Sequence, residues 1–172
     1  MPESLPLNPG PLLQVLLEHE VEFIVIGGVN AILHGAPVHT FDLDIVHART
    51  EENYPRLLNA FQELQAYYRG RGTQKLFPRK EWLAADGPNL LQTKLGALDC
   101  LGTIVGNRSY EDLLPHTELV VLRDKLQVRV LDLPTLIQIK EETGRPKDKS
   151  MLFTLRATLA EKQLQQQPPN AQ

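Results

Sequence analysis

Hydrophobic residues follow two different spacings along the chain, and each spacing predicts a different kind of element. A continuous apolar run, Phe-Ile-Val-Ile at residues 23–26, is typical of a strand buried on both faces, and Gly27-Gly28 ends it. Apolar residues three or four positions apart predict amphipathic helices instead. Helices are expected at residues 9–19, 29–34, 50–66, 110–114, 133–142 and 147–162.

Short apolar runs separated by turn residues predict strands. Residues 90–94 and 97–101, joined by Leu95-Gly96, are expected to form a β-hairpin, and residues 119–122 and 126–130 a second strand pair. Residues 42–46 predict a further strand. Because helices and strands mix without strict βαβ alternation, the expected fold class is α+β, with a mixed central β-sheet flanked by helices.

The length of 172 residues predicts one domain, which we place at residues 1–162. The Gln- and Pro-rich tail at residues 163–172 is expected to be disordered, and the Pro-rich residues 1–8 are expected to be poorly ordered.

Composition narrows the setting in which the protein works. A formal net charge of −3 excludes strong attraction of the whole surface to nucleic acid, although it leaves a local basic patch open. Cys100 is the only cysteine, so neither an internal disulfide nor a cysteine-rich zinc site can form, which fits a reducing compartment. The sequence shows no secretory signal and no apolar run of membrane-spanning length. We therefore expect a soluble, cytoplasmic protein without membrane association.

Two carboxylates occur in a strand that is otherwise apolar. Asp42 and Asp44 alternate with Phe41, Leu43 and Ile45, so both aspartates share one face of the strand. Aspartate is disfavoured in strands, and two like charges on one face repel unless a divalent cation lies between them. The structural alternative is an edge strand with two solvent-facing aspartates.

The Gly27-Gly28 turn comes shortly before this strand. Glycines let backbone N–H groups approach an anion closely, and the start of a helix adds a favourable dipole, although a plain tight turn would need the same residues. A phosphate-binding turn followed by paired carboxylates leads to the hypothesis of a metal-dependent nucleotidyl transfer site.

The order Gly-Gly, spacer, Asp-Leu-Asp resembles the minimal nucleotidyltransferase superfamily, with its DNA polymerase beta-like fold, and within it the toxin-associated AbiEii-like branch. The resemblance implies that Gly27 and Gly28 hold the phosphates of an NTP, and that Asp42 and Asp44 bind two Mg²⁺ ions. It also implies a third metal-binding carboxylate on a neighbouring strand. Asp99, with apolar residues on both sides, is expected to be that carboxylate; a hairpin aspartate near a turn is the alternative.

The resemblance extends to a helix that carries Lys140, followed by Gly-Arg-Pro-Lys-Asp at residues 144–148. It implies that Lys140, Arg145 and Lys147 neutralise the triphosphate. A lysine on the apolar side of a helix costs desolvation energy unless an anion meets it. The alternatives are a snorkelling lysine and an Arg145–Asp148 pair that only holds the helix turn.

The chain departs from its relatives at two places. Val38 and His39 stand where relatives often carry an arginine, and Met151 stands where many have an aspartate. These departures keep open a second function, that of a catalytically weakened protein that binds a nucleotide or a partner such as a cognate antitoxin.

For an active enzyme, the resemblance implies transfer of a nucleoside monophosphate from an NTP such as ATP to an acceptor hydroxyl. RNA, especially a tRNA end, is the favoured acceptor, which would suit the toxin of a toxin–antitoxin pair; a protein or a small molecule remains open. The segment from Arg69 to Lys80 has five basic and no acidic residues, and is expected to be a loop that grips acceptor phosphates or is simply solvated. Trp82 could stack on a base or pack in the core, and Cys100 is expected to be a core thiol.

Overall fold

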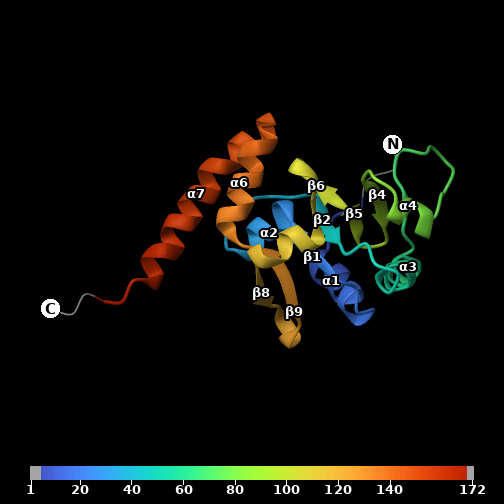
Figure 1. Cartoon of the computed structure of the whole chain (residues 1–172), viewed down its shortest axis with the longest axis horizontal. Helices are drawn as coiled ribbons and strands as arrows, with labels where there is room; N and C mark the ends of the chain where they lie inside the picture. The colour runs from blue at the N-terminus through green and yellow to red at the C-terminus, as the bar shows by residue number, and fades with distance from the viewer. Residues whose placement is uncertain (1–4, 170–172) are drawn as a thin grey trace.

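The computed structural model describes residues 5–169, apart from the Asp124 side chain, and is built around one mixed sheet. Its seven strands lie in the order β3-β4-β5-β2-β1-β9-β8 (Figure 1). Their bounds are β1 Phe23–Ile26, β2 Asp42–His47, β3 Tyr67–Tyr68, β4 Asn89–Thr93, β5 Gly96–Leu101, β8 Thr117–Val121 and β9 Gln127–Leu131. A separate pair is formed by β6 Thr103–Ile104 and β7 Arg108–Ser109.

Parallel and antiparallel pairs both occur in this sheet. Strand β2 lies in the middle, antiparallel to β1 and parallel to β5. Strands β4 and β5 form the expected hairpin, β8 and β9 form the second expected pair, and β1 runs parallel to β9. The mixed sheet confirms the expected α+β class.

Helices cover both faces of the sheet. Their bounds are α1 Pro9–Glu18, α2 Gly27–Leu33, α3 Asn53–Glu63, α4 Lys80–Ala84, α5 Tyr110–Leu113, α6 Leu133–Thr143 and α7 Pro146–Gln166, with short 3₁₀ turns η1 Val105–Asn107, η2 Leu114–His116 and η3 Arg123–Lys125. Helices α1, α3 and α4 share the main core with one face of the sheet, whereas α2, α6 and α7 form a second apolar cluster. Helices α6 and α7 pack together, and the far end of α7 projects beyond the sheet (Figure 1).

Burial alternates along the central strands with the period of two that the sequence predicts. Leu43 and Ile45 on β2 are fully buried in the main core, together with Leu98 and Cys100 on β5. Cys100 is therefore a core thiol, as expected, and its burial raises the pKa of the thiol well above the usual range. The alternate positions of both strands point to the other face.

Some local expectations need correction. Helix α2 begins at Gly27 rather than after the glycine pair, and α7 continues to Gln166, so residues 163–166 are helical rather than part of a disordered tail. The end of that tail, residues 170–172, and residues 1–4 of the Pro-rich start lie outside the described residues. The basic segment is mostly a loop, but Lys80 already begins α4, which the sequence analysis did not predict.

Among residues 5–169, no helix combines the length and the apolar character that crossing a bilayer requires.

Neighbouring leucines on β4 test the alternation directly. Leu91 is fully buried, whereas Leu90 is 40% exposed on the opposite face. Leu91→Ala should lower the free energy of unfolding by about 2–5 kcal/mol, because it removes packed atoms and leaves a cavity. Leu90→Ala should cost less than about 1 kcal/mol. Urea unfolding followed by circular dichroism measures both values, and equal losses would contradict this placement of β4.

Candidate active site

Three aspartates from two adjacent strands meet on one face of the sheet. Asp42 and Asp44 lie on the β2 face opposite Leu43, and the parallel register places Asp99 of β5 directly beside Asp44. Each aspartate offers one carboxylate oxygen, and these oxygens all lie within 4.8 Å of one another. The structure thus brings together the three carboxylates that the sequence predicted to form a metal site.

The carboxylates perturb one another electrostatically. Burial raises the pKa of Asp44 to about 7, and repulsion from Asp42 and Asp99 contributes to the rise, whereas Lys140 and Lys147 oppose it. Burial also raises the pKa of Asp99, against the opposing effect of Arg69. This partly buried excess of negative charge favours a bound cation.

Gly27 packs directly against Asp44 of β2, and Gly28 packs against Thr40, which lies just before this strand. Gly27 has φ +68°, and a Cβ there would lie 2.3 Å from Asp44 Oδ2. At Gly28 a Cβ would lie 2.6 Å from the Cβ of Thr40, whose hydroxyl donates to the backbone oxygen of Asp42 at 3.0 Å. Only glycine at both positions lets the first turn of α2 approach Asp44 and Thr40 this closely. The predicted contact of these glycines with phosphate stays a prediction.

Lys140 and Arg145 share one buried anion. Lys140 Nζ donates to Asp148 Oδ1 at 2.9 Å, and Arg145 Nε donates to Asp148 Oδ2 at 2.7 Å. Burial raises the pKa of Asp148, but the hydrogen bonds from Arg145 and Lys140 outweigh burial and hold this pKa below its ordinary value. The helix-turn pairing that the sequence left open is therefore present, and two cations around one carboxylate leave a net positive charge.

Two cavities adjoin the carboxylates and bring the predicted site residues together. The smaller has a volume of about 90 Å³ and is lined by Gly28, His39, Thr40, Asp42, Asp44, Asp99, Lys140, Arg145, Lys147 and Met151. The larger, of about 290 Å³, has Gly27 and the apolar side chains of Leu101, Leu131 and Leu136 in its wall. Asp44, Asp99, Lys140 and Arg145 line both cavities.

Arg69 contacts the site, which the sequence analysis did not foresee. It follows β3 and donates from Nη2 to Asp99 Oδ1 at 2.6 Å, and from Nη1 to the carbonyl oxygen of Leu91 at 3.3 Å. Its placement in a glycine-containing basic segment predicted a phosphate contact or solvation, because nothing local indicates that Arg69 lies beside β4 and that its side chain reaches Asp99 on β5.

Val38 and Met151, where the resemblance leads us to expect polar side chains, lie in apolar surroundings, whereas His39 lines the smaller cavity. Met151 is buried and Val38 packs against the same cluster, between α2, α6 and α7. His34, in contrast, lies away from the carboxylates: its Nε2 bonds the carbonyl oxygen of Leu131 at 2.7 Å, and Lys162 Nζ donates to its Nδ1 at 2.8 Å.

The chemistry of the donor set fits a hard divalent cation such as Mg²⁺. The three aspartates offer hard, anionic oxygen ligands, which Mg²⁺ prefers, and burial together with their mutual repulsion raises the pKa of Asp44. Gly27 removes the side chain that would otherwise fill the space at Asp44 Oδ2. Asp42, Asp44 and Asp99 are thus the residues that would hold the metal.

Neither the protein-family models nor the curated proteins contain a match to this sequence. Among solved structures, a candidate nucleotidyltransferase from Thermotoga maritima is similar to this chain with a TM-score of 0.54 and 21% sequence identity. The alignment covers 94% of this chain and 99% of that protein. The chain has a nucleotidyltransferase-like fold. The AbiEii-like branch of the superfamily stays a prediction.

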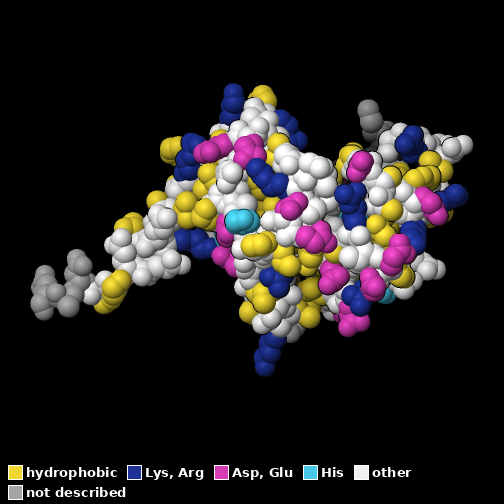
Figure 2. Space-filling view, in the orientation of Figure 1, with side chains coloured by type: hydrophobic (Ala, Val, Ile, Leu, Met, Phe, Trp, Pro, Cys, Tyr) yellow, Lys and Arg dark blue, Asp and Glu magenta, His cyan; other side chains and the backbone are white. Residues whose placement is uncertain are grey.

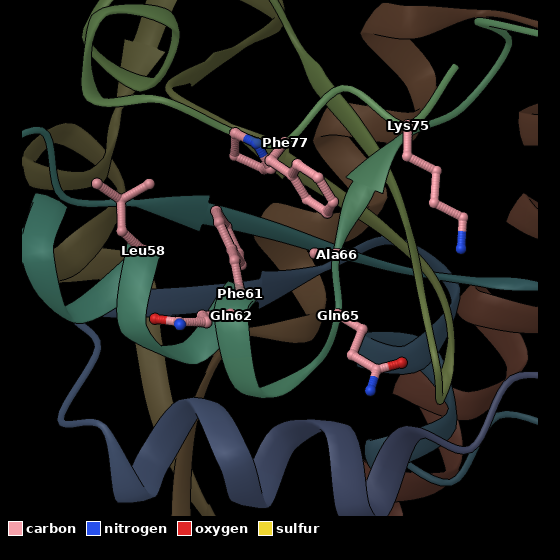
Figure 3. A pocket seen from close by; sticks show the side chains of 8 residues that line it. Leu58, Phe61, Gln62, Gln65, Ala66, Lys75 and Phe77 are labelled. Atoms are coloured by element: carbon pink, nitrogen blue, oxygen red, sulfur yellow. The ribbon is translucent and has the colours of Figure 1, made fainter. Parts of the chain in front are cut away.

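A larger cavity lies away from this site. It measures about 610 Å³ and is lined by Leu58, Phe61, Gln62, Gln65, Ala66, Lys75, Phe77 and Pro78 (Figure 3). Phe61 belongs to the main core, with Leu43 and Leu98, and therefore to the sheet face opposite the aspartates. The site residues that the sequence predicts line the smaller cavities at the carboxylates instead.

The raised pKa of Asp44 predicts a pH dependence of stability. Without added metal, folded Asp44 keeps a proton between about pH 4 and pH 7 that the unfolded chain releases. The free energy of unfolding should therefore fall across this interval, by at most about 1.4 kcal/mol per pH unit from this group. Asp44→Asn should gain stability relative to the wild type over the same range. Urea unfolding in EDTA measures both profiles, and parallel profiles would contradict the raised pKa.

Two glycines with positive φ provide a matched test of the space that Gly27 leaves open at Asp44 Oδ2. Gly27→Ala adds a clash with Asp44 to the backbone strain, whereas Gly35, with φ +90°, has open space around it. Gly27→Ala should weaken Mg²⁺ binding by about tenfold, which corresponds to about 1.4 kcal/mol, and Gly35→Ala should leave binding near the wild-type value. Isothermal titration calorimetry with Mg²⁺ measures both, and equal affinities would argue against a metal held at Asp44.

Proposed function

We propose that this protein is a metal-dependent nucleotidyltransferase that moves a nucleoside monophosphate from an NTP to an acceptor hydroxyl. The observation that carries the proposal is the convergence of the Asp42, Asp44 and Asp99 carboxylates within 4.8 Å, in a chain with a nucleotidyltransferase-like fold. Two Mg²⁺ ions, held by these residues, would supply the positive charge that stabilises the attacking and leaving oxygens of an in-line displacement.

The proposed reaction forms one bond and breaks one. The acceptor oxygen bonds to the α-phosphorus of the NTP, while the bond from this phosphorus to the oxygen that bridges to the β-phosphorus breaks. Pyrophosphate leaves with the bonding electron pair, and Asp99 orients the acceptor hydroxyl and accepts its proton. The position of Asp99 beside Asp44, in the wall of both cavities, supports this role.

Positive and neutral donors around the carboxylates would hold the triphosphate. Lys140, Arg145 and Lys147 line the cavity that Asp42 and Asp44 enter. Asp148 fixes the Lys140 and Arg145 side chains, so less entropy would be lost when a phosphate binds. The backbone N–H groups of the glycine turn at residues 27–28 are the proposed neutral donors.

RNA, with a tRNA end as the leading case, is the acceptor we propose. The support is the resemblance to toxin-associated nucleotidyltransferases and the basic segment that ends in Lys80, whose first residue, Arg69, contacts Asp99. In this proposal the protein acts as the toxin of a toxin–antitoxin pair, and a cognate antitoxin is its partner.

A second function is favoured by the ion pairs of the site. Arg69 binds Asp99, and Lys140 binds Asp148, so both cations already have an anionic partner, and Met151 adds an apolar side chain to the wall of the cavity. These features favour a nucleotidyltransferase-like protein that binds a nucleotide or a partner without transferring the nucleotide.

The double variant Asp42→Asn, Asp44→Asn tests the proposal. It should reduce transfer of label from α-³²P-labelled NTPs to total RNA by at least about a thousandfold, because the ligands that hold both ions are lost. Asp86→Asn, at an aspartate whose side chain is 95% exposed, makes the same chemical change outside the site and should leave transfer unchanged. In the same experiment, we would measure how far each NTP, with Mg²⁺, protects the wild-type protein against thermal unfolding.

The outcomes separate the two functions. Labelling that persists in the double variant would overturn the nucleotidyltransferase assignment. Thermal protection of the wild type by Mg²⁺ and an NTP, without labelling of RNA, protein or small molecules, would establish the binding function instead.

A further inference from the structure

The sheet face that carries Asp99 stays accessible on the side of β4 and β3. Leu90 pairs with Asp99 and Tyr67 pairs with Gln92, and paired residues of antiparallel strands point to the same face. Leu90 is 40% exposed, and Tyr67 and Gln92 are half-buried, whereas Leu91 is buried on the opposite face. We call Tyr67, Leu90 and Gln92, with the adjoining Arg69, the open face.

Basic side chains border the open face. Lys75 Nζ lies 5.0 Å from the centre of the Tyr67 ring, and Arg69 reaches across to Asp99. Lys75 also lines the cavity of Phe61 and Phe77, and Figure 3 shows its side chain directed away from these two rings. The strands β3, β4 and β5 contain no acidic residue besides Asp99. The open face therefore combines an aromatic ring and an aliphatic side chain with two basic side chains, Arg69 and Lys75.

Charge on the rest of the molecule is mixed. The formal net charge is −3, and acidic and basic side chains are interspersed on the face that Figure 2 shows. Attraction of a polyanion must therefore come from a local surface. The open face carries two basic side chains, Lys75 and Arg69, and it is continuous with the candidate active site through the contact of Arg69 with Asp99.

We propose that the open face binds the end of a single-stranded RNA acceptor, an inference that rests on the proposed function. One base stacks on Tyr67 and Leu90, and the adjoining phosphates lie near Lys75 and Arg69. Aromatic rings bind unpaired bases by stacking, and cations bind the backbone between them. A base in a duplex has no free face to offer, so the platform selects single strands.

The position of the open face fits delivery of a terminal hydroxyl to Asp99. Tyr67 on β3 lies two strands from Asp99 on β5, which corresponds to about 10 Å across the sheet. The base on Tyr67 therefore belongs to the last few nucleotides of the acceptor. Arg69 lies between the two, and its guanidinium has more donors than the contacts to Asp99 and Leu91 use, so it can also bind a phosphate.

Fluorescence anisotropy with a 5′-fluorescein-labelled single-stranded RNA of mixed sequence, without NTP or Mg²⁺, tests the inference. Tyr67→Ser should raise the Kd by about tenfold because stacking is lost, whereas Tyr67→Phe keeps the ring and should bind like the wild type. Lys75→Ala should raise the Kd and lower the slope of log Kd against log salt by about 1.

Arg123→Ala is the charge-matched control for Lys75→Ala. Arg123 is exposed at the β8–β9 turn, at the opposite edge of the sheet, so its loss should change neither the Kd nor the salt slope. Thermal unfolding identifies any variant that fails to fold. If Tyr67→Ser fails to fold, the inference is tested by the salt slopes of Lys75→Ala and Arg123→Ala alone.

Three results would overturn the inference: no binding of the RNA by the wild type, equal Kd values for the wild type, Tyr67→Ser and Lys75→Ala, or equal competition by a duplex of the same sequence. Protection of the wild type by Mg²⁺ and an NTP is measured separately. Its presence together with absent RNA binding overturns the open-face assignment alone, whereas the absence of NTP protection overturns the proposed function.

Discussion

The parallel pairing of β2 with β5 is the constraint on which the candidate site depends. Asp44 lies directly beside Asp99 in this register, while Leu43 pairs with Leu98 and Ile45 with Cys100 on the buried face. Side chains alternate along a strand, so a shift by one residue would place Asp99 in the core and an apolar residue beside Asp44. Burial of the apolar pairs thus holds the carboxylates together, although the carboxylates repel one another.

The surroundings of the carboxylates offset this repulsion only in part. Arg69 forms an ion pair with Asp99. Lys140 and Arg145, in contrast, are both paired with buried Asp148. Burial and the neighbouring carboxylates keep the pKa of Asp44 raised, to about 7, despite the opposing effect of Lys140 and Lys147. A fold that keeps such a cluster without full compensation retains an electrostatic preference for a divalent cation, which is the physical basis of the proposed function. The glycine pair contributes by leaving the space at Asp44 Oδ2 free.

Much of the fold follows from local patterns. Continuous apolar runs identified β1, alternation identified β2, and turn residues between apolar runs identified the β4–β5 and β8–β9 pairs. The strand β3 and the helix α4 were missed. The two residues of β3 are too few to show the alternation of a strand. The five residues of α4 cover little more than one helical turn, which is too short to show the spacing of an amphipathic helix. Both elements exist because neighbouring strands and the core stabilise them.

The sequence by itself determined that Asp42 and Asp44 share a face, because that depends only on the period of a strand. It also located the glycine turn, the helix that carries Lys140 and the hairpin that carries Asp99. Only the tertiary structure decided that Asp99 lies beside Asp44, that Arg69 contacts it and that Asp148 binds Lys140. These contacts join residues distant along the chain. They depend on strand order, register and helix packing, which are set by burial of the whole core rather than by the spacing of residues within any one segment.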